Sequence, residues 1–268
     1  MSAGIKANVD GSGAIQVGGS DYITISSAGV VNIPQSLTIA GVPVGTINTQ
    51  TFNSSGTWTK PSSGDFVRIQ MWGGGGGGAR VATTSTSAGG GGGYFELTVP
   101  IALMGATATV TVGAAGVGRT ASAGSGTAGG NSSVTAVNGS TVYVSGGLPG
   151  VAGTGGNGGY GALTFDTTAV SDPAGNGQGG DSCAAAKPGY SYTGGGGGAV
   201  GGSTGSKGAY GGGGGTRGTG AGGTSVFGGA GGNSAGAGVQ PGGGGGCSSS
   251  ANTNATDGAL GRVIITTY

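Results

Sequence analysis

Few side chains of this chain could carry out chemistry. It has no histidine, which excludes Ser-His-Asp and Cys-His catalysis and any metal site that needs an imidazole ligand. Two cysteines, Cys183 and Cys247, are too few for a zinc or iron–sulfur centre, and they could form a disulfide or remain thiols. Asp166 and Asp172 could form the carboxylate pair of a glycosidase, but nothing around them sets them apart. We predict a non-enzymatic protein without metal or cofactor.

The side chains best suited to binding are aromatic ones in the glycine-rich half. Such rings can stack on sugar faces, with basic neighbours as polar contacts. The segment 181–193 is the strongest candidate loop, because it holds two tyrosines and a lysine between glycine tracts. The alternative is that each ring covers a neighbouring strand or a subunit seam. The predicted receptor-binding residues are Lys187, Tyr190, Tyr192, Tyr210, Arg217 and Phe227.

Two further aromatic residues, Trp58 and Trp72, lie at the ends of predicted strands. A large ring at such a position more often packs in a core or between subunits than it binds a ligand. We therefore expect both tryptophans to be structural.

Charge and hydropathy argue against a nucleic-acid-binding, disordered or membrane-inserted protein. Only 6% of the residues are charged, with 9 basic and 8 acidic side chains, so no electrostatic field attracts nucleic acid or an anionic membrane. Hydrophobic residues make up 34%, whereas disordered chains combine low hydrophobicity with many charges. A helix that spans a bilayer needs a run of about 18 apolar residues, and the chain contains no such run. We expect a folded protein that binds no nucleic acid and does not insert into membranes.

The elements that would position the binding residues are short β-strands. Residues 66–72 alternate, with Val67, Ile69 and Met71 on one face. Asn138-Gly139 predicts a tight hairpin between residues 134–137 and 141–144. Further strands are expected at residues 94–99, 107–112 and 262–267, and a second hairpin between residues 51–53 and 57–60. Since no segment shows a 3.6-residue apolar period, the chain is predicted to be all-β.

The first 48 residues differ from the rest in having only a modest share of glycine. Their apolar runs have four or fewer residues, which is too short for a private core. They favour an intertwined region completed by other copies of the chain. The runs lie at residues 14–17, 22–25, 30–33 and 37–39.

Glycine is the dominant residue elsewhere, with 75 in the whole chain. Pure tracts interrupt the strands, and between them a period of three appears, as in Gly147, Gly150 and Gly153. Three residues per turn is the repeat of polyproline II, which polyglycine also adopts. Strands without side chains can approach closely enough to pair their amides laterally, since the helix has no internal hydrogen bonds. The tracts are residues 73–78, 89–93, 194–198, 211–215 and 242–246.

Several blocks in a fixed order resemble a known family. Thr57-Trp58-Thr59-Lys60-Pro61 comes first, Met71-Trp72 runs into Gly73–Gly78, and Gly261-Arg262-Val263-Ile264-Ile265 closes the chain. Over residues 49–268 this order resembles the glycine-rich domain of bacteriophage tail-fibre proteins. Residues 6–26 resemble the openings of phage fibre proteins, which lead into virion attachment.

The resemblance implies a trimeric fibre or fibre tip that recognises a bacterial surface. We therefore expect an all-β, intertwined homotrimer, in which residues 1–48 attach to other tail or baseplate proteins. Residues 49–268 would form a β-sandwich-like glycine-rich domain with polyglycine II segments and receptor-facing loops. The receptor would be a bacterial glycan or outer-surface protein, bound multivalently by a virion assembled in the host cytoplasm. A virion connector without receptor binding and an ice-binding polyglycine II protein are the alternatives.

Overall fold

The computed structural model divides the chain into two compact units, Met1–Thr46 and Ile47–Tyr268. The structure describes residues 47–80, 87–137, 139–151, 195–199, 204–217, 220–234, 236–248 and 253–268, and the backbone of six strands before residue 47 and of two between residues 152 and 194. In these parts of the chain the regular structure is β, apart from one 3-10 turn, Ile101–Leu103. The all-β prediction is confirmed.

The first unit contains an antiparallel sheet with the strand order β1-β2-β3-β4. These strands pair with one another within one chain. Strand β3 has six residues, so the prediction that the strands here have four or fewer residues was wrong. A separate two-stranded pair, β5-β6, follows. The bounds are β1 Ala3–Ala7, β2 Gly13–Val17, β3 Ser20–Ile25, β4 Val31–Asn32, β5 Thr38–Ile39 and β6 Val42–Pro43.

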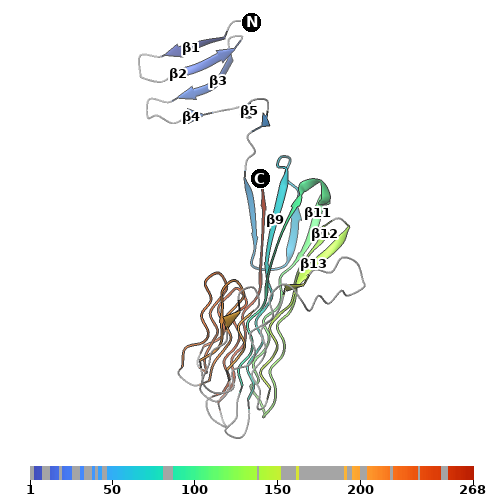
Figure 1. Cartoon of the computed structure of the whole chain (residues 1–268), viewed down its shortest axis with the longest axis vertical. Helices are drawn as coiled ribbons and strands as arrows, with labels where there is room; N and C mark the ends of the chain where they lie inside the picture. The colour runs from blue at the N-terminus through green and yellow to red at the C-terminus, as the bar shows by residue number, and fades with distance from the viewer. Residues whose placement is uncertain are drawn as a thin grey trace. The chain divides into compact units, whose positions relative to one another are not determined.

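The second unit begins with two antiparallel sheets, in the orders β10-β9-β17-β7 and β14-β13-β12-β11-β8. Figure 1 shows these strands at one end of the unit. The bounds are β7 Asn48–Phe52, β8 Gly56–Thr59, β9 Phe66–Trp72, β10 Tyr94–Pro100, β11 Thr107–Thr111, β12 Ser132–Val137, β13 Ser140–Val144, β14 Gly161–Ala162 and β17 Arg262–Thr267.

The two sheets form a sandwich around one apolar core. Alternate residues of each strand point inward, as β9 shows with fully buried Val67, Ile69 and Met71. The facing sheet contributes Trp58, Val110 and similar side chains to the same cluster. The expected structural role of Trp58 is confirmed, because its ring is fully buried there.

One predicted hairpin is wrong and one is confirmed. Strands β7 and β8 lie in different sheets, where β7 pairs with β17 and β8 with β11. The turn between them therefore crosses from one sheet to the other. By contrast, β12 and β13 pair directly around Gly139, whose φ of +73° suits a tight turn.

Beyond the sandwich the strands continue as a lattice of extended glycine-rich segments (Figure 1). The segment 73–79, which follows β9, lies at the centre of six hydrogen-bonded neighbours. Its N–H groups donate in a cycle of three, from Gly74 to Gly130, from Gly75 to Ala259 and from Gly76 to Gly90, with N···O distances of 2.8–2.9 Å. Its carbonyl groups accept in the same cycle from residues 116–119, 147–150 and 245–248. This is the lateral pairing predicted for polyglycine II.

Glycine is required in the lattice for space. A Cβ on Gly76 would lie 2.1 Å from the carbonyl oxygen of Leu148, and most described glycines of the central tracts meet a backbone atom as closely. Positive φ, which also favours glycine, occurs among the described lattice glycines only at Gly124 and Gly242. The tracts are therefore glycine because a strand surrounded on six sides has no direction in which a side chain fits.

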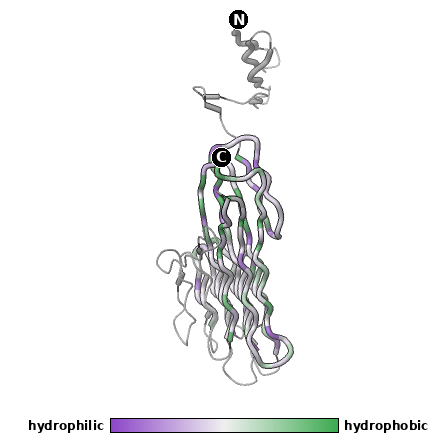
Figure 2. Tube along the Cα trace, turned by 90° about the vertical axis from the view of Figure 1, so that its right-hand side faces the viewer, coloured by the Kyte–Doolittle hydropathy of each residue, from purple (hydrophilic) through white to green (hydrophobic). Residues whose placement is uncertain are grey.

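The sandwich and the lattice share their strands. Strand β9 runs directly into residues 73–79, and residues 87–93 run directly into β10. Figure 2 shows the consequence for hydropathy, since the sandwich strands alternate in colour while the lattice strands are mostly pale. The lattice thus begins where the side-chain core ends.

Candidate functional site

The outer face of the sheet β10-β9-β17-β7 carries an uncommon set of polar side chains. On β9, Arg68 and Gln70 alternate with the core positions and Trp72 follows the last of them, so these three residues point away from the core. Antiparallel pairing sets Gln70 opposite Glu96 and Trp72 opposite Tyr94 on β10. Directly opposed residues are close enough for their side chains to interact.

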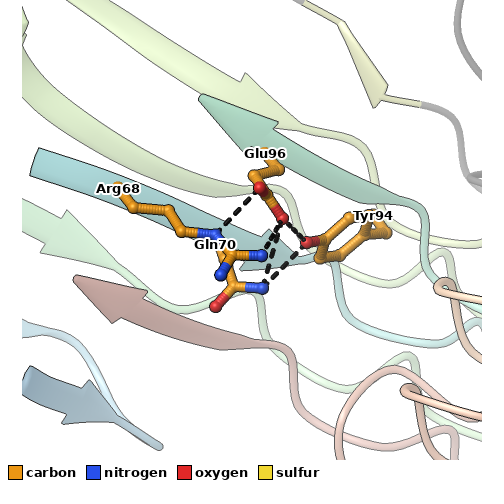
Figure 3. A network of polar contacts seen from close by, with 4 residues as sticks. All are labelled: Arg68, Gln70, Tyr94 and Glu96. Carbon is orange, nitrogen blue, oxygen red and sulfur yellow. Dashed lines mark hydrogen bonds and ion pairs between the residues drawn. The ribbon is translucent and has the colours of Figure 1, made fainter. Parts of the chain in front are cut away.

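These polar side chains form one connected network (Figure 3). The Arg68 guanidinium donates from Nε and Nη2 to the two carboxylate oxygens of Glu96, at 2.8 Å each. The Gln70 amide nitrogen donates to the Tyr94 hydroxyl at 2.9 Å and to Glu96 Oε2 at 3.3 Å. The Tyr94 hydroxyl donates in turn to Glu96. We call these four residues the polar network.

The network determines the charge state of its members. The two hydrogen bonds from Arg68 lower the pKa of Glu96 below its usual value, although partial burial opposes them. Burial and the hydrogen bond to Glu96 raise the pKa of Tyr94. The carboxylate is therefore ionised and the phenol protonated at neutral pH, so that the network carries one balanced ion pair.

An aromatic row adjoins the network through Tyr94. The ring of Tyr94 lies 4.9 Å from that of Trp72 and 5.0 Å from that of Tyr210, measured between centroids. Tyr210 in turn stacks on Phe227 at 4.7 Å with an interplanar angle of 15°. Trp72 and Tyr94 are buried, Tyr210 is half-buried, and Phe227 is 56% exposed. The row therefore runs from the sheet to the surface of the unit.

Backbone contacts hold the outer two rings. Tyr210 lies between β16 (Lys207–Gly208) and the glycine tract that starts at residue 211, and its carbonyl oxygen accepts from Trp72 Nε1 at 2.7 Å. The Phe227 amide donates to the Ala209 carbonyl oxygen at 3.0 Å. Ser225 Oγ closes the Phe227 turn, because it donates to Gly211 and accepts from the Gly228 amide.

The predicted binding residues are only partly assembled. Tyr210 and Phe227 lie in direct contact in the aromatic row. The backbone of Tyr190, in β15 (Tyr190–Ser191), pairs in parallel with Lys207 of β16, next to this row. Arg217 lies opposite Cys247 at the other end of the tract that begins beside Tyr210.

Other predictions fall outside the described residues. Lys187 and Tyr192 are among them, as are the two aspartates at positions 166 and 172. Cys183 also lies outside the described residues. Cys247, with which it could form a disulfide, is buried, and its sulfur lies 3.9 Å from the Thr216 carbonyl oxygen.

Sequence reasoning missed the polar network. The alternation of β9 places Arg68 and Gln70 on the outer face, which was a usable signal. Their pairing with Tyr94 and Glu96 depends on the register of β10, which follows a glycine tract. Trp72 is structural as expected, although it packs in the aromatic row on the outer face and not in the sandwich core.

Two searches of the described residues complete the description of the site. They contain no helix long and apolar enough to cross a membrane. They also contain no group of three or more His, Cys, Asp and Glu side chains placed to hold a metal ion.

Comparison with known proteins identifies a family over most of the chain. A search of curated proteins found no match to the chain. The family described as a glycine-rich domain matches residues 48–268, which includes every strand of the sandwich and the whole lattice. The chain therefore belongs to the glycine-rich domain family.

Proposed function

We propose that the chain is a bacteriophage tail-fibre or fibre-tip protein that attaches to a bacterial surface receptor by multivalent, non-catalytic binding. The observation that carries the proposal is the lattice of the second unit. Its central strands have no side chains, so that chemical variety is confined to the perimeter and the connecting loops. Such a body is suited to presenting surface residues on a stiff support.

The proposal includes a homotrimer with its first unit bound to the virion. Three weak sites on one fibre, and several fibres on one particle, give avidity without tight individual sites. Light scattering of the full-length protein should then give a mass near three times 24.4 kDa. A monomeric mass contradicts the trimer.

Cell binding tests attachment itself. Fluorescently labelled full-length protein should bind to at least one strain in a panel of bacteria, and unlabelled protein should compete for the same sites. On that strain, free protein should also reduce phage adsorption. A connector that contacts only other virion proteins would bind no strain and leave adsorption unchanged.

A further inference from the structure

We propose that the end of the lattice farthest from the sandwich binds an acidic polysaccharide of the bacterial surface through Arg80 and Arg119. We call these two residues the arginine tip. The inference rests on the proposed attachment function and names the site and the ligand class of that attachment.

The arginine tip lies where the central strand of the lattice ends. Arg80 follows the segment 73–79, which at about 3.1 Å per residue extends about 22 Å beyond β9. Arg119 lies beside this segment, since its amide donates to the Gly78 carbonyl oxygen at 3.1 Å. Gly124 connects the two arginines: its backbone pairs with that of Arg80, and a Cβ on it would lie 3.3 Å from Nε of Arg119. The two side chains therefore belong to one surface.

The loop that follows Arg119 holds both guanidinium groups. Nη1 of Arg80 donates to the carbonyl oxygen of Thr120, and to that of Ala121 at 3.1 Å. Arg119 donates from Nε to the Ser122 carbonyl oxygen at 3.3 Å and from Nη2 to the Ser122 hydroxyl at 2.8 Å. The acceptors belong to three consecutive residues, so the two groups are fixed on the same short stretch of backbone.

No described acid neutralises these two charges. All the acceptors of Arg80 and Arg119 are uncharged oxygens, including Oδ1 of Asn254 at 3.2 Å from Nη1 of Arg80. Asp257, the described acid of the lattice, accepts from the Gly118 amide at 2.7 Å and forms no ion pair with a described residue. A guanidinium group stays protonated in proteins. The hydrogen bonds thus position two full positive charges without cancelling them.

Such an arrangement favours an anionic ligand. Like charges on one surface repel each other, and only 6% of the residues of this chain are charged at all. The charged residues that the structure describes in the lattice are nevertheless mostly basic. They are Arg80, Arg119, Lys207 and Arg217, against Asp257.

Both arginines keep donors for a ligand. Nε and Nη2 of Arg80, and Nη1 of Arg119, donate to no described residue. Arg119 is exposed and Arg80 is half-buried. The planar fork of a guanidinium group matches the oxygens of a carboxylate or a phosphate.

The ligand is a polymer because each arginine can contact an anionic group of its own. Neither contact is enclosed by a cavity, so each should be weak and exchange quickly. A chain with repeated acidic groups can occupy both arginines at once and those of other copies, which raises the overall affinity.

The test uses the full-length protein and three polymers with one backbone: neutral dextran, carboxymethyl dextran and dextran phosphate. Binding to each immobilised polymer is measured by biolayer interferometry. We expect at least one charged dextran to bind, and the two charged forms show whether carboxylate or phosphate is preferred. Binding should weaken between 0.1 and 1 M salt, because the Debye length falls from about 10 Å to about 3 Å. Equal binding to neutral dextran would overturn the inference.

Variants of the arginine tip locate the site. Arg80→Gln and Arg119→Gln should each weaken binding about 5-fold or more, since each removes hydrogen bonds between charged groups. Arg119→Lys keeps the charge and should weaken binding less than Arg119→Gln. Because Arg119 is exposed, its two variants test the site even if Arg80→Gln disturbs the loop. Equal losses for lysine and glutamine would contradict an electrostatic site.

A matched control lies in the sandwich. Arg262 of β17 donates from Nε to Oδ1 of Asn53 at 2.8 Å and forms no ion pair with a described residue. Arg262→Gln removes the same charge and should leave polymer binding unchanged. A loss equal to that of Arg119→Gln would mean that net charge alone governs binding, and would overturn the assignment of the site.

The remaining outcomes separate this inference from the function on which it rests. If the protein binds cells but neither charged dextran, the site is overturned while attachment stands. If the charged dextrans bind as expected but no bacterial strain does, the attachment function fails and the site stands. Duplex DNA is the comparison polyanion, and binding to DNA at least as tight as to the charged dextrans would overturn the polysaccharide as the ligand.

Discussion

The sandwich and the lattice of the second unit bury their strands in opposite ways. In the sandwich, alternate side chains such as Ile69 and Val263 fill the space between two sheets. In the lattice, the interior of the segment 73–79 is filled by the backbones of its neighbours. The first region is stabilised mainly by apolar area removed from water, and the second by backbone hydrogen bonds and close packing.

This difference in packing determines which substitutions the sandwich and the lattice each tolerate. A side-chain core loses stability when atoms are removed, and the loss scales with the cavity that remains. A backbone core has no atoms to lose and fails when one is added. The entropic cost also differs, because glycine loses more backbone freedom on folding than any other residue, which the dense hydrogen bonding of the lattice must offset.

The largest effect is expected from adding one methyl group at the lattice centre. In Gly76→Ala the Cβ would lie 2.1 Å from the Leu148 carbonyl oxygen, and only movement of a whole strand could relieve this contact. We expect a loss of more than about 4 kcal/mol in the free energy of unfolding, or failure to fold. Chemical denaturation measures it.

A control for this variant lies at the edge of the lattice. The Cβ of Gly220→Ala would meet its nearest atom at 3.5 Å, an ordinary contact. This variant should be close to wild type. Equal stability of the two alanine variants would show that the lattice can yield, and would contradict the contrast with the sandwich.

The sandwich should respond to the opposite change, and in a graded way. Ile69 is fully buried between the sheets, so Ile69→Ala should cost about 2–5 kcal/mol and Ile69→Val about 0.5–1.5 kcal/mol. Urea unfolding of both variants gives the comparison. Similar losses for alanine and valine would mean that side-chain volume does not govern this core.

Heat capacity provides a global measure of the same contrast. Apolar surface raises the heat capacity on exposure and polar surface lowers it. Because the lattice buries mostly peptide groups, calorimetry should give a ΔCp of unfolding below the usual value of about 12–15 cal/mol/K per residue. The denaturant m-value, which follows total exposed surface, should be ordinary for the size of the chain. A ΔCp within the usual range would indicate that side-chain burial dominates in both regions.

The smallest effect is expected at the partly exposed ion pair of the polar network. The folded-state pKa of Glu96 is lowered, so its contribution is present above the usual pKa of about 4.5 and is lost as the pH falls through the folded value. Glu96→Gln should therefore cost at most about 1 kcal/mol at pH 7, and the difference from wild type should vanish in acid. Stability measured against pH tests this.

An exposed acid outside the network is the control for this substitution. Asp65 makes no ion pair with a described residue, so Asp65→Asn removes an acid without breaking a salt bridge and should leave the stability at pH 7 closer to wild type than Glu96→Gln does. A difference for Glu96→Gln that grows as the pH falls would contradict the assigned direction of the pKa.

Prediction from sequence succeeded where the pattern is local. The alternation of residues 66–72 correctly located β9, the strand expected at residues 262–267 is β17, and Asn138-Gly139 correctly located the turn between β12 and β13. It failed at residues 51–60, because Ser54-Ser55-Gly56 is as compatible with a crossing between sheets as with a hairpin. The choice between them depends on β17, more than two hundred residues away.

The candidate site shows the same limit. Composition was enough to single out Tyr210 and Phe227 as candidate rings in a glycine-rich segment, although only Phe227 is exposed and Tyr210 is half-buried. It could not bring them to Tyr94, since no local pattern links residue 94 to residue 210. The polar network was missed for a related reason, because the pairing of Gln70 with Glu96 depends on the register between two strands separated by a glycine tract.

The sequence by itself determined the all-β class, the strands with alternating residues and the presence of a polyglycine lattice, because each follows from residue types repeated at short spacing. Only the tertiary structure decided which six neighbours surround residues 73–79 and which four rings make the aromatic row. The physical reason is that a glycine tract carries no side chain with which to select a partner. Its neighbours are set by the sandwich strands and loops at its ends, whose pairing extends over the whole unit.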